Sequence, residues 1–449
     1  MEKLFGTDGI RGRANCYPIT PEVALQVGKA IAHVFGASGH GSRRAVLGKD
    51  TRLSGYMLET ALTSGLVSMG MDVFLVGVLP TPAVAHLTRS LAATVGIMLT
   101  ASHNPYDDNG IKIFDQDGFK LSDELEAEIE RHVLKGDLSG EHIRSDTMGK
   151  AYRIEDARGR YIEFAKSTAG NQNLSGLRIV LDCSNGAAYR IGPWIFEELG
   201  AKVHRAFDSP DGYNINNGCG ALHPETVGAL VRQHHADVGI ALDGDADRVV
   251  FTDHEGQIVD GDRILAMCAL EFHARGQLRH DTLVVTTMSN LGLHETMAAH
   301  GIRVITTDVG DRMVIDAMRT GGYNLGGEKS GHVIFMDYVT TGDGIITALQ
   351  VLRLMKQRGV SLRELAACMR EYPQQLVSLS VARKVPLDSL PAVTAVLDEA
   401  RSALDSRGRV IVRYSGTEPK IRILVEASSE DLVTTWVQRL SEVLQRELS

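Results

Sequence analysis

Residues 238–248 read Val-Gly-Ile-Ala-Leu-Asp-Gly-Asp-Ala-Asp-Arg, an apolar run that leads into three alternating carboxylates. The apolar run predicts a buried strand, and open α/β sheets place their ligands beyond the carboxyl ends of such strands. Asp243, Asp245 and Asp247 would repel one another there, and a divalent cation relieves this repulsion; hard oxygen ligands favour Mg²⁺. A lone motif of this kind would more often be a solvated acidic turn. An EF-hand is excluded, because arginine and histidine occupy its glycine and glutamate positions.

The order of strand, polar turn and helix occurs several times along the chain. Short apolar runs at 45–48, 178–181 and 282–285 each end in small polar residues, and helix-compatible sequence follows. This order is typical of βαβ units. The sequence therefore predicts the α/β class, with three domains of similar plan.

The C-terminal segment follows another plan, that of a small α+β domain beginning near Pro373. Its predicted elements are a strand at 376–381, a helix at 390–403, strands at 410–413 and 421–426, and a helix at 431–446. The four predicted domains span residues 1–150, 151–255, 256–371 and 372–449.

Composition limits the classes of function. A chain of 449 residues is too long for a single core, and its net charge of -9 argues against a nucleic-acid partner. No apolar run indicates a signal peptide or a membrane-spanning helix, so no membrane partner is expected. The five cysteines are odd in number and form no C-x-x-C pair, which predicts the reducing cytoplasm and neither a disulfide framework nor a thiolate zinc site.

A second predicted strand, 95–100, leads into Ala-Ser-His-Asn-Pro at 101–105. The segment lacks the G-x-S-x-G pattern of the α/β-hydrolases. Ser102 and His103 are adjacent, and because adjacent side chains usually diverge, we expect no dyad from these two alone. Ser102 by itself would more often be a turn residue. Near a carboxylate-bound cation, a phosphorylated Ser102 would offer a further anionic oxygen to the ion.

Two further loops carry groups that bind anions or sugars. Residues 413–420, with Arg422 beyond them, combine guanidinium, hydroxyl and glycine, as a phosphate-binding loop does, although an ordinary hairpin turn has a similar composition. Residues 326–332 offer carboxylate and hydroxyl groups for sugar hydroxyls, and the alternative is a glycine-rich turn. No segment forms the G-x-x-x-x-G-K-[ST] loop of nucleotide hydrolases.

Five motifs, taken in order along the chain, together resemble the α-D-phosphohexomutase superfamily over essentially the whole chain. They lie at residues 5–12, 100–105, 243–248, 327–332 and 413–420. Residues 306–312 and 340–344, with the opening motif, suggest the bacterial branch that acts on glucosamine phosphates.

The resemblance implies three similar α/β domains with mixed sheets and a C-terminal α+β domain around a central cleft. It also implies an isomerase that interconverts glucosamine 6-phosphate and glucosamine 1-phosphate and feeds amino-sugar nucleotide and cell-wall precursor synthesis. In this scheme Ser102 is the phosphoserine. One Mg²⁺ per chain would be held by Ser102, Asp243, Asp245 and Asp247.

The resemblance assigns further residues to the sugar, the phosphate and the reacting end. Sugar hydroxyls would be bound by Glu328 and Ser330. The phosphate that does not react would be held by Arg413, Ser415, Gly416, Thr417 and Arg422. The reacting end would be lined by Arg11, Lys112, Arg248 and His332.

The implied reaction passes through glucosamine 1,6-bisphosphate, and either Lys112 or His332 is the general base. A kinase or a bisphosphate donor would first phosphorylate Ser102. The resemblance leaves open whether the chain forms a homodimer. Three alternatives remain: a phosphoglucomutase or phosphomannomutase with the same motifs, a magnesium-dependent phosphatase, and a phosphosugar-binding protein without activity.

Overall fold

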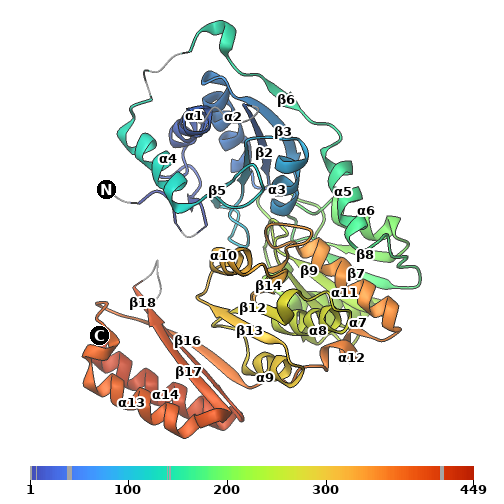
Figure 1. Ribbon diagram of the computed structural model, residues 1–449, viewed down its shortest axis with the longest axis vertical. Helices are drawn as coiled ribbons and strands as arrows, with labels where there is room; N and C mark the ends of the chain where they lie inside the picture. The colour runs from blue at the N-terminus through green and yellow to red at the C-terminus, as the bar shows by residue number, and fades with distance from the viewer. Residues whose placement is uncertain are drawn as a thin grey trace. The chain divides into compact units, whose positions relative to one another are not determined.

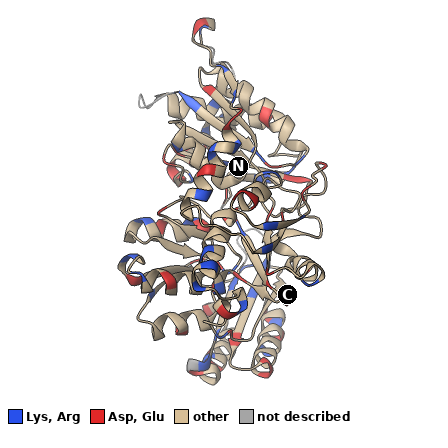
Figure 2. Ribbon diagram, turned by 90° about the vertical axis from the view of Figure 1, so that its right-hand side faces the viewer, with Lys and Arg blue, Asp and Glu red and all other residues tan. Residues whose placement is uncertain are grey.

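The computed structural model describes residues 3–6, 8–37, 43–138, 140, 143–414 and 419–448 (Figure 1). The chain divides into two compact units. Unit 1 comprises Met1–Met288 and Gly301–Cys368, and unit 2 comprises Ser289–His300 and Met369–Ser449. Acidic and basic residues are interspersed along the ribbon (Figure 2).

Unit 1 begins with a mixed six-stranded sheet of order β1-β5-β4-β2-β3-β6. Strands β2, β3, β4 and β6 run parallel, whereas β5 pairs antiparallel with both β4 and β1. The strands are β1 (Ile10–Arg13), β2 (Arg44–Lys49), β3 (Asp72–Val78), β4 (Val95–Leu99), β5 (Asp108–Phe114) and β6 (Ala151–Arg153). The helices are α1 (Pro21–Ala37), α2 (Ser54–Ser68), α3 (Thr81–Ser90) and α4 (Asp123–Lys135). Helices α1, α2 and α4 share one apolar core with β2 and β4.

The second sheet has the order β11-β10-β9-β7-β8. Strands β7, β8 and β9 are parallel, and β10 pairs antiparallel with both β9 and β11. Its strands are β7 (Arg178–Asp182), β8 (Lys202–Ala206), β9 (Val238–Leu242), β10 (Val249–Asp253) and β11 (Ile258–Val259). Its helices are α5 (Ala157–Thr168), α6 (Ile191–Glu198) and α7 (Pro224–His234). Every residue of β9 is buried, as expected for a strand covered on both faces.

The third sheet has the order β13-β12-β14-β15. Its strands are β12 (Thr282–Thr286), β13 (Arg303–Thr307), β14 (Leu325–Gly327) and β15 (Val333–Phe335). Its helices are α8 (Gly261–Ala274), α10 (Asp311–Gly321), α11 (Gly344–Arg358) and α12 (Leu362–Ala366). The predicted strands at 45–48, 178–181 and 282–285 are confirmed as β2, β7 and β12, and the prediction of mixed α/β sheets is confirmed as well.

Unit 2 contains an antiparallel sheet of order β16-β18-β17, on which helices α13 and α14 lie side by side (Figure 1). The elements are α9 (Leu291–Ala299), β16 (Gln374–Ser380), α13 (Pro391–Leu404), β17 (Gly408–Tyr414), β18 (Lys420–Ala427) and α14 (Glu430–Leu448). The five predicted C-terminal elements are confirmed. The four domain boundaries stay predictions. Among the described helices, none combines the length and the apolar character needed to cross a membrane.

Candidate active site

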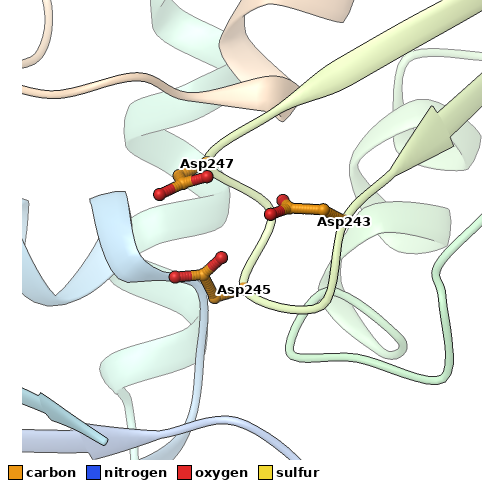
Figure 3. A group of neighbouring side chains, drawn as sticks. All are labelled: Asp243, Asp245 and Asp247. Carbon is orange, nitrogen blue, oxygen red and sulfur yellow. The ribbon is translucent and has the colours of Figure 1, made fainter. Parts of the chain in front are cut away.

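Three buried carboxylates converge in the hairpin loop between β9 and β10 (Figure 3). One oxygen each from Asp243, Asp245 and Asp247 can be chosen so that all three atoms lie within 4.8 Å of one another. Ala246 adopts a left-handed φ of 57°, which helps to turn the chain so tightly. The strand that the sequence predicts thus delivers the acidic loop to the end of the second sheet.

The donor set of this triad fits a magnesium ion. Oδ1 of Asp245 and Oδ1 of Asp247 are buried without a hydrogen-bond partner among the described residues. Burial, together with the charges of the other two aspartates, raises the pKa of Asp243 well above its usual range. Buried carboxylate oxygens that repel one another and lack donors are suited to a hard divalent cation.

Ser102 lies against the triad. Its side chain is buried, and its Oγ donates a hydrogen bond of 2.7 Å to Oδ2 of Asp243. A phosphate on a serine at this distance from Asp243 would reach an ion held by the three carboxylates.

The expectation that Ser102 and His103 diverge is wrong. Ser102 has a left-handed φ of 51°, and this turn brings Nδ1 of His103 to 3.3 Å from the Ser102 Oγ. Burial lowers the pKa of His103 to about 4, and the charges of Arg248 and Arg11 lower it in the same direction. The imidazole beside Ser102 is therefore neutral at neutral pH.

Lys112 projects from β5 into the triad. Its Nζ lies 2.9 Å from Oδ2 of Asp245, 3.1 Å from Oδ2 of Asp247 and 3.4 Å from Oδ2 of Asp8. Burial opposes the charge of Lys112, but these three carboxylates raise its pKa well above the usual value. Lys112 is therefore a buried cation that balances part of the acidic loop.

Two arginines also reach this region. Nη1 of Arg248 lies 3.2 Å from Nδ1 of His103, and Arg11 forms an ion pair with Asp8. The Nε atoms of Arg11 and Arg248 are buried and have no hydrogen-bond partner among the described residues. Unused guanidinium donors close to Ser102 are suited to a phosphate.

The loop between β14 and β15 contributes His332 and Glu328. The Gly342 N–H donates to Nε2 of His332 over 3.0 Å, and Nδ1 of His332 lies 3.7 Å from Oδ1 of Asp247. Burial alone would lower the pKa of His332, but Asp247 and other carboxylates raise it. Glu328 is buried and accepts a 3.2 Å hydrogen bond from the Gly310 N–H, whereas Ser330 is exposed.

Sequence reasoning missed Lys120 and the role of its two carboxylate partners. Lys120 is nearly buried and forms ion pairs with Asp8 of the first domain and Asp311 at the start of α10. Burial would raise the pKa of Asp8, but Lys112, Lys120 and Arg11 hold it well below its usual range. Asp8 and Asp311 both lie in motifs noted above, whereas no pattern in the sequence singles out Lys120.

The predicted phosphate-binding residues belong to unit 2. Arg413 is the last residue but one of β17, and its register partner on β18 is Arg422. Like charges directly opposite each other on a sheet are unfavourable, and an anion relieves that repulsion. Ser415, Gly416 and Thr417 lie outside the described residues.

Comparison with known proteins agrees with the resemblance. Family models described as phosphoglucomutase/phosphomannomutase match in four parts: alpha/beta/alpha domain I at residues 2–139, domain II at 159–256, domain III at 260–372 and the C-terminal domain at 376–443. The chain is 51% identical to the phosphoglucosamine mutase of Geotalea daltonii, covering 100% of this chain and 99% of the relative. It is also 51% identical to that of Myxococcus xanthus, covering 100% and 98%.

Solved structures agree in fold. A phosphoglucomutase/phosphomannomutase family protein from Burkholderia thailandensis superposes with a TM-score of 0.82 at 24% identity, covering 99% of this chain and 97% of that one. N-acetylphosphoglucosamine mutase from Aspergillus fumigatus, in complex with GlcNAc-6P and magnesium, gives 0.72 at 18% identity, covering 99% and 96%. The predicted recognition is confirmed. The chain therefore belongs to the phosphoglucomutase/phosphomannomutase family of phosphohexomutases, a family of isomerases, and within it groups with the phosphoglucosamine mutases.

Proposed function

We propose that the chain interconverts glucosamine 6-phosphate and glucosamine 1-phosphate through a phosphorylated Ser102. One observation carries the proposal: the Ser102 hydroxyl lies 2.7 Å from Asp243 inside a buried carboxylate triad. Relatives that are about half identical over the full chain, and are named for this activity, support the choice of sugar.

The reaction would begin with phosphoryl transfer from Ser102 to O1 of glucosamine 6-phosphate. The P–O bond to Ser102 breaks as a P–O bond to the sugar forms. The sugar hydroxyl gives its proton to a general base, and the Ser102 oxygen takes up a proton as it leaves. Of the two predicted bases, Lys112 and His332, we retain His332, because three carboxylates hold Lys112 as a cation. The bisphosphate then turns end for end and returns its 6-phosphate to Ser102. Such transfers depend on positioning and on charge stabilisation more than on covalent chemistry.

The charged side chains around Ser102 would stabilise the transferred group. Arg11 and Arg248 would donate to its oxygens through the guanidinium nitrogens that are unused in this structure, and Lys112 would contribute a fixed positive charge. Mg²⁺ held by Asp243, Asp245 and Asp247 would supply Lewis acidity and offset the phosphate charge.

The remaining part of the substrate would be held by two sets of residues. Glu328 and Ser330 would bind sugar hydroxyls. The phosphate that does not react would be bound by Arg413, Ser415, Gly416, Thr417 and Arg422. Under this assignment, Arg413→Ala weakens phosphosugar binding and leaves Mg²⁺ affinity unchanged in isothermal titration; the opposite ranking would remove Arg413 from the phosphate site.

The cellular setting is part of the same proposal. Ser102 would be primed by a kinase or by glucosamine 1,6-bisphosphate in the cytoplasm, and the product would feed amino-sugar nucleotide and cell-wall precursor synthesis. A homodimer is compatible with this scheme, and sedimentation analysis of the full chain would establish the oligomeric state.

Turnover with matched sugars tests the proposal. Enzyme primed with the matching 1,6-bisphosphate is given glucosamine 1-phosphate or glucose 1-phosphate with Mg²⁺, and ³¹P NMR follows each 6-phosphate. We expect a higher kcat/KM for the amino sugar. Equal or reversed preference would move the chain to the phosphoglucomutase activity, and steady release of inorganic phosphate would indicate a phosphatase. Intact-protein mass, with Ser102→Ala as the control, reports whether one phosphate is carried on Ser102.

A further inference from the structure

A fully buried arginine binds the loop that carries Ser102, residues 101–109, here called the Ser102 loop. Arg52, just before α2, is 0% exposed, and its guanidinium makes five hydrogen bonds. One is a 2.8 Å bond from Nε to Oδ2 of Asp50, and four go to backbone carbonyls. Those carbonyls belong to Ser102, Asn104, Pro105 and Asp108. A guanidinium has five N–H donors, so four of the five hold this one loop and the fifth holds Asp50.

The partner of Arg52 is tied to the same loop. Oδ2 of Asp50 accepts a 2.7 Å hydrogen bond from the Thr100 hydroxyl. The same hydroxyl oxygen, Oγ1 of Thr100, accepts a 2.9 Å hydrogen bond from the Ser102 N–H. Asp50 and Arg52 form an ion pair with both side chains 0% exposed. The backbone on both sides of the Ser102 peptide is thus fixed by one charged pair.

A second residue grips the loop from another part of unit 1. The side-chain amide of Asn216 donates to the Ser102 and Asn104 carbonyls over 2.9 and 3.0 Å. Nη2 of Arg52 donates to the same two carbonyls, at 3.0 and 2.8 Å. Each carbonyl therefore accepts two hydrogen bonds, one from the first domain and one from the segment between β8 and α7.

This arrangement leaves the Ser102 backbone little freedom. The left-handed φ of Ser102 is uncommon for a residue with a side chain, and such conformations persist only where the surroundings fix them. The same turn directs Oγ to Asp243 and brings His103 beside it. The Ser102 and Asn104 carbonyls are fully engaged by Arg52 and Asn216, which fixes the peptide planes that follow Ser102 and Asn104.

We propose that Arg52, assisted by Asn216, is a positioning residue for phosphoryl transfer, which holds the Ser102 Oγ in line with the triad without touching substrate. The inference rests on the proposed function, because it concerns the step in which Ser102 gives and receives the phosphoryl group. A misplacement of about 1 Å at such a centre costs about 100-fold in rate. The effect should fall on kcat, because the residues that would bind the sugar lie elsewhere.

Arg52→Lys is the direct test, because it keeps the charge but offers three donors in place of a five-donor fork. We expect kcat to fall about 100-fold with KM within about twofold of the wild-type value. Hydrogen–deuterium exchange of residues 101–109 should become faster. Arg275→Lys is the matched control, because that arginine also contacts a carboxylate and an amide oxygen, those of Glu271 and Gln357, but none of the Ser102 loop.

Each outcome decides the matter. Wild-type kcat in folded Arg52→Lys, or a raised KM at unchanged kcat, would overturn the positioning role. If Arg52→Lys does not fold, Asn216→Gly carries the same test, since Asn216 has a left-handed φ of 59° that glycine adopts freely; we expect a loss of about tenfold in kcat. If the wild-type enzyme turns over no phosphosugar, the proposed function fails. Unchanged hydrogen–deuterium exchange of residues 101–109 in Arg52→Lys would still refute the inference that Arg52 fixes this loop.

Discussion

Replacing Lys112 by methionine should destabilise the metal-free protein and strengthen magnesium binding. The Nζ of Lys112 lies 2.9 and 3.1 Å from oxygens of Asp245 and Asp247. At an effective dielectric constant of about 20, each contact is worth roughly 5 kcal/mol before desolvation is subtracted. Removing one partner of a buried ion pair typically costs about 3–5 kcal/mol, because the other charges stay buried and unpaired.

The assay has two readouts that do not depend on turnover. In EDTA, the melting temperature of Lys112→Met should fall by about 10 °C. This figure combines the loss of about 3–5 kcal/mol with a shift of about 2–4 °C for each kcal/mol. In isothermal titration, the variant should bind Mg²⁺ at least about tenfold more tightly, about 1.4 kcal/mol, because no ammonium competes for the carboxylates. Lys112→Arg keeps the charge and should show neither change at full size.

Unchanged or weaker Mg²⁺ binding in Lys112→Met would refute the reasoning, since it would mean that Lys112 and the ion do not share the aspartates. Lys166→Met removes a half-buried lysine that forms ion pairs with the exposed Glu163 and Glu198, and it controls for the loss of one positive charge from the chain. Its effect on both readouts should be small.

Three further predictions use other parts of the chain. Ser102→Ala should abolish mutase turnover and leave the melting temperature within a few degrees of wild type; retained turnover would take Ser102 out of the reaction. His86, stacked on Phe164, has its pKa lowered to about 4 by burial and by Arg89, so the native state binds fewer protons than the unfolded chain between pH 4 and 6.5. Stability should therefore fall by about 2 kcal/mol as the pH drops through this range, and thermal melts of His86→Phe should show a flatter pH profile. Gly331→Ala should destabilise by about 2 kcal/mol or more, because its Cβ would meet a backbone oxygen at 2.1 Å, whereas Gly276→Ala, with a positive φ but open space, should cost about 1 kcal/mol.

The elements and the convergence of the three aspartates could be predicted from the sequence because their causes are local. A continuous apolar run predicts a buried strand, and β9 is buried at every position. Asp243 and its two neighbours follow that strand directly, so their convergence needs only a tight turn. Arg413 and Arg422, the predicted phosphate ligands, are register partners on adjacent strands, whereas their phosphate-binding role stays a prediction.

The rest of the site depends on contacts between distant segments. Lys120 acquires its role from Asp8 and Asp311, which are 112 and 191 residues away in the chain. The approach of His103 to Ser102 depends on a left-handed φ at Ser102. That conformation is held by Arg52, whose hydrogen-bond partners lie up to 56 residues away. No local pattern specifies such contacts.

The charges of the described site bear on the metal ion and the two phosphates that we propose it binds. The described site holds six carboxylates, those of Asp8, Asp243, Asp245, Asp247, Asp311 and Glu328. Its arginine and lysine side chains number four: Arg11, Lys112, Lys120 and Arg248. One divalent cation would close this difference of two charges. A phosphate on Ser102 adds about -1.5 to -2 charges again, which would repel the second phosphate of a substrate. That second phosphate therefore needs basic residues of its own, which is the role we propose for Arg413 and Arg422.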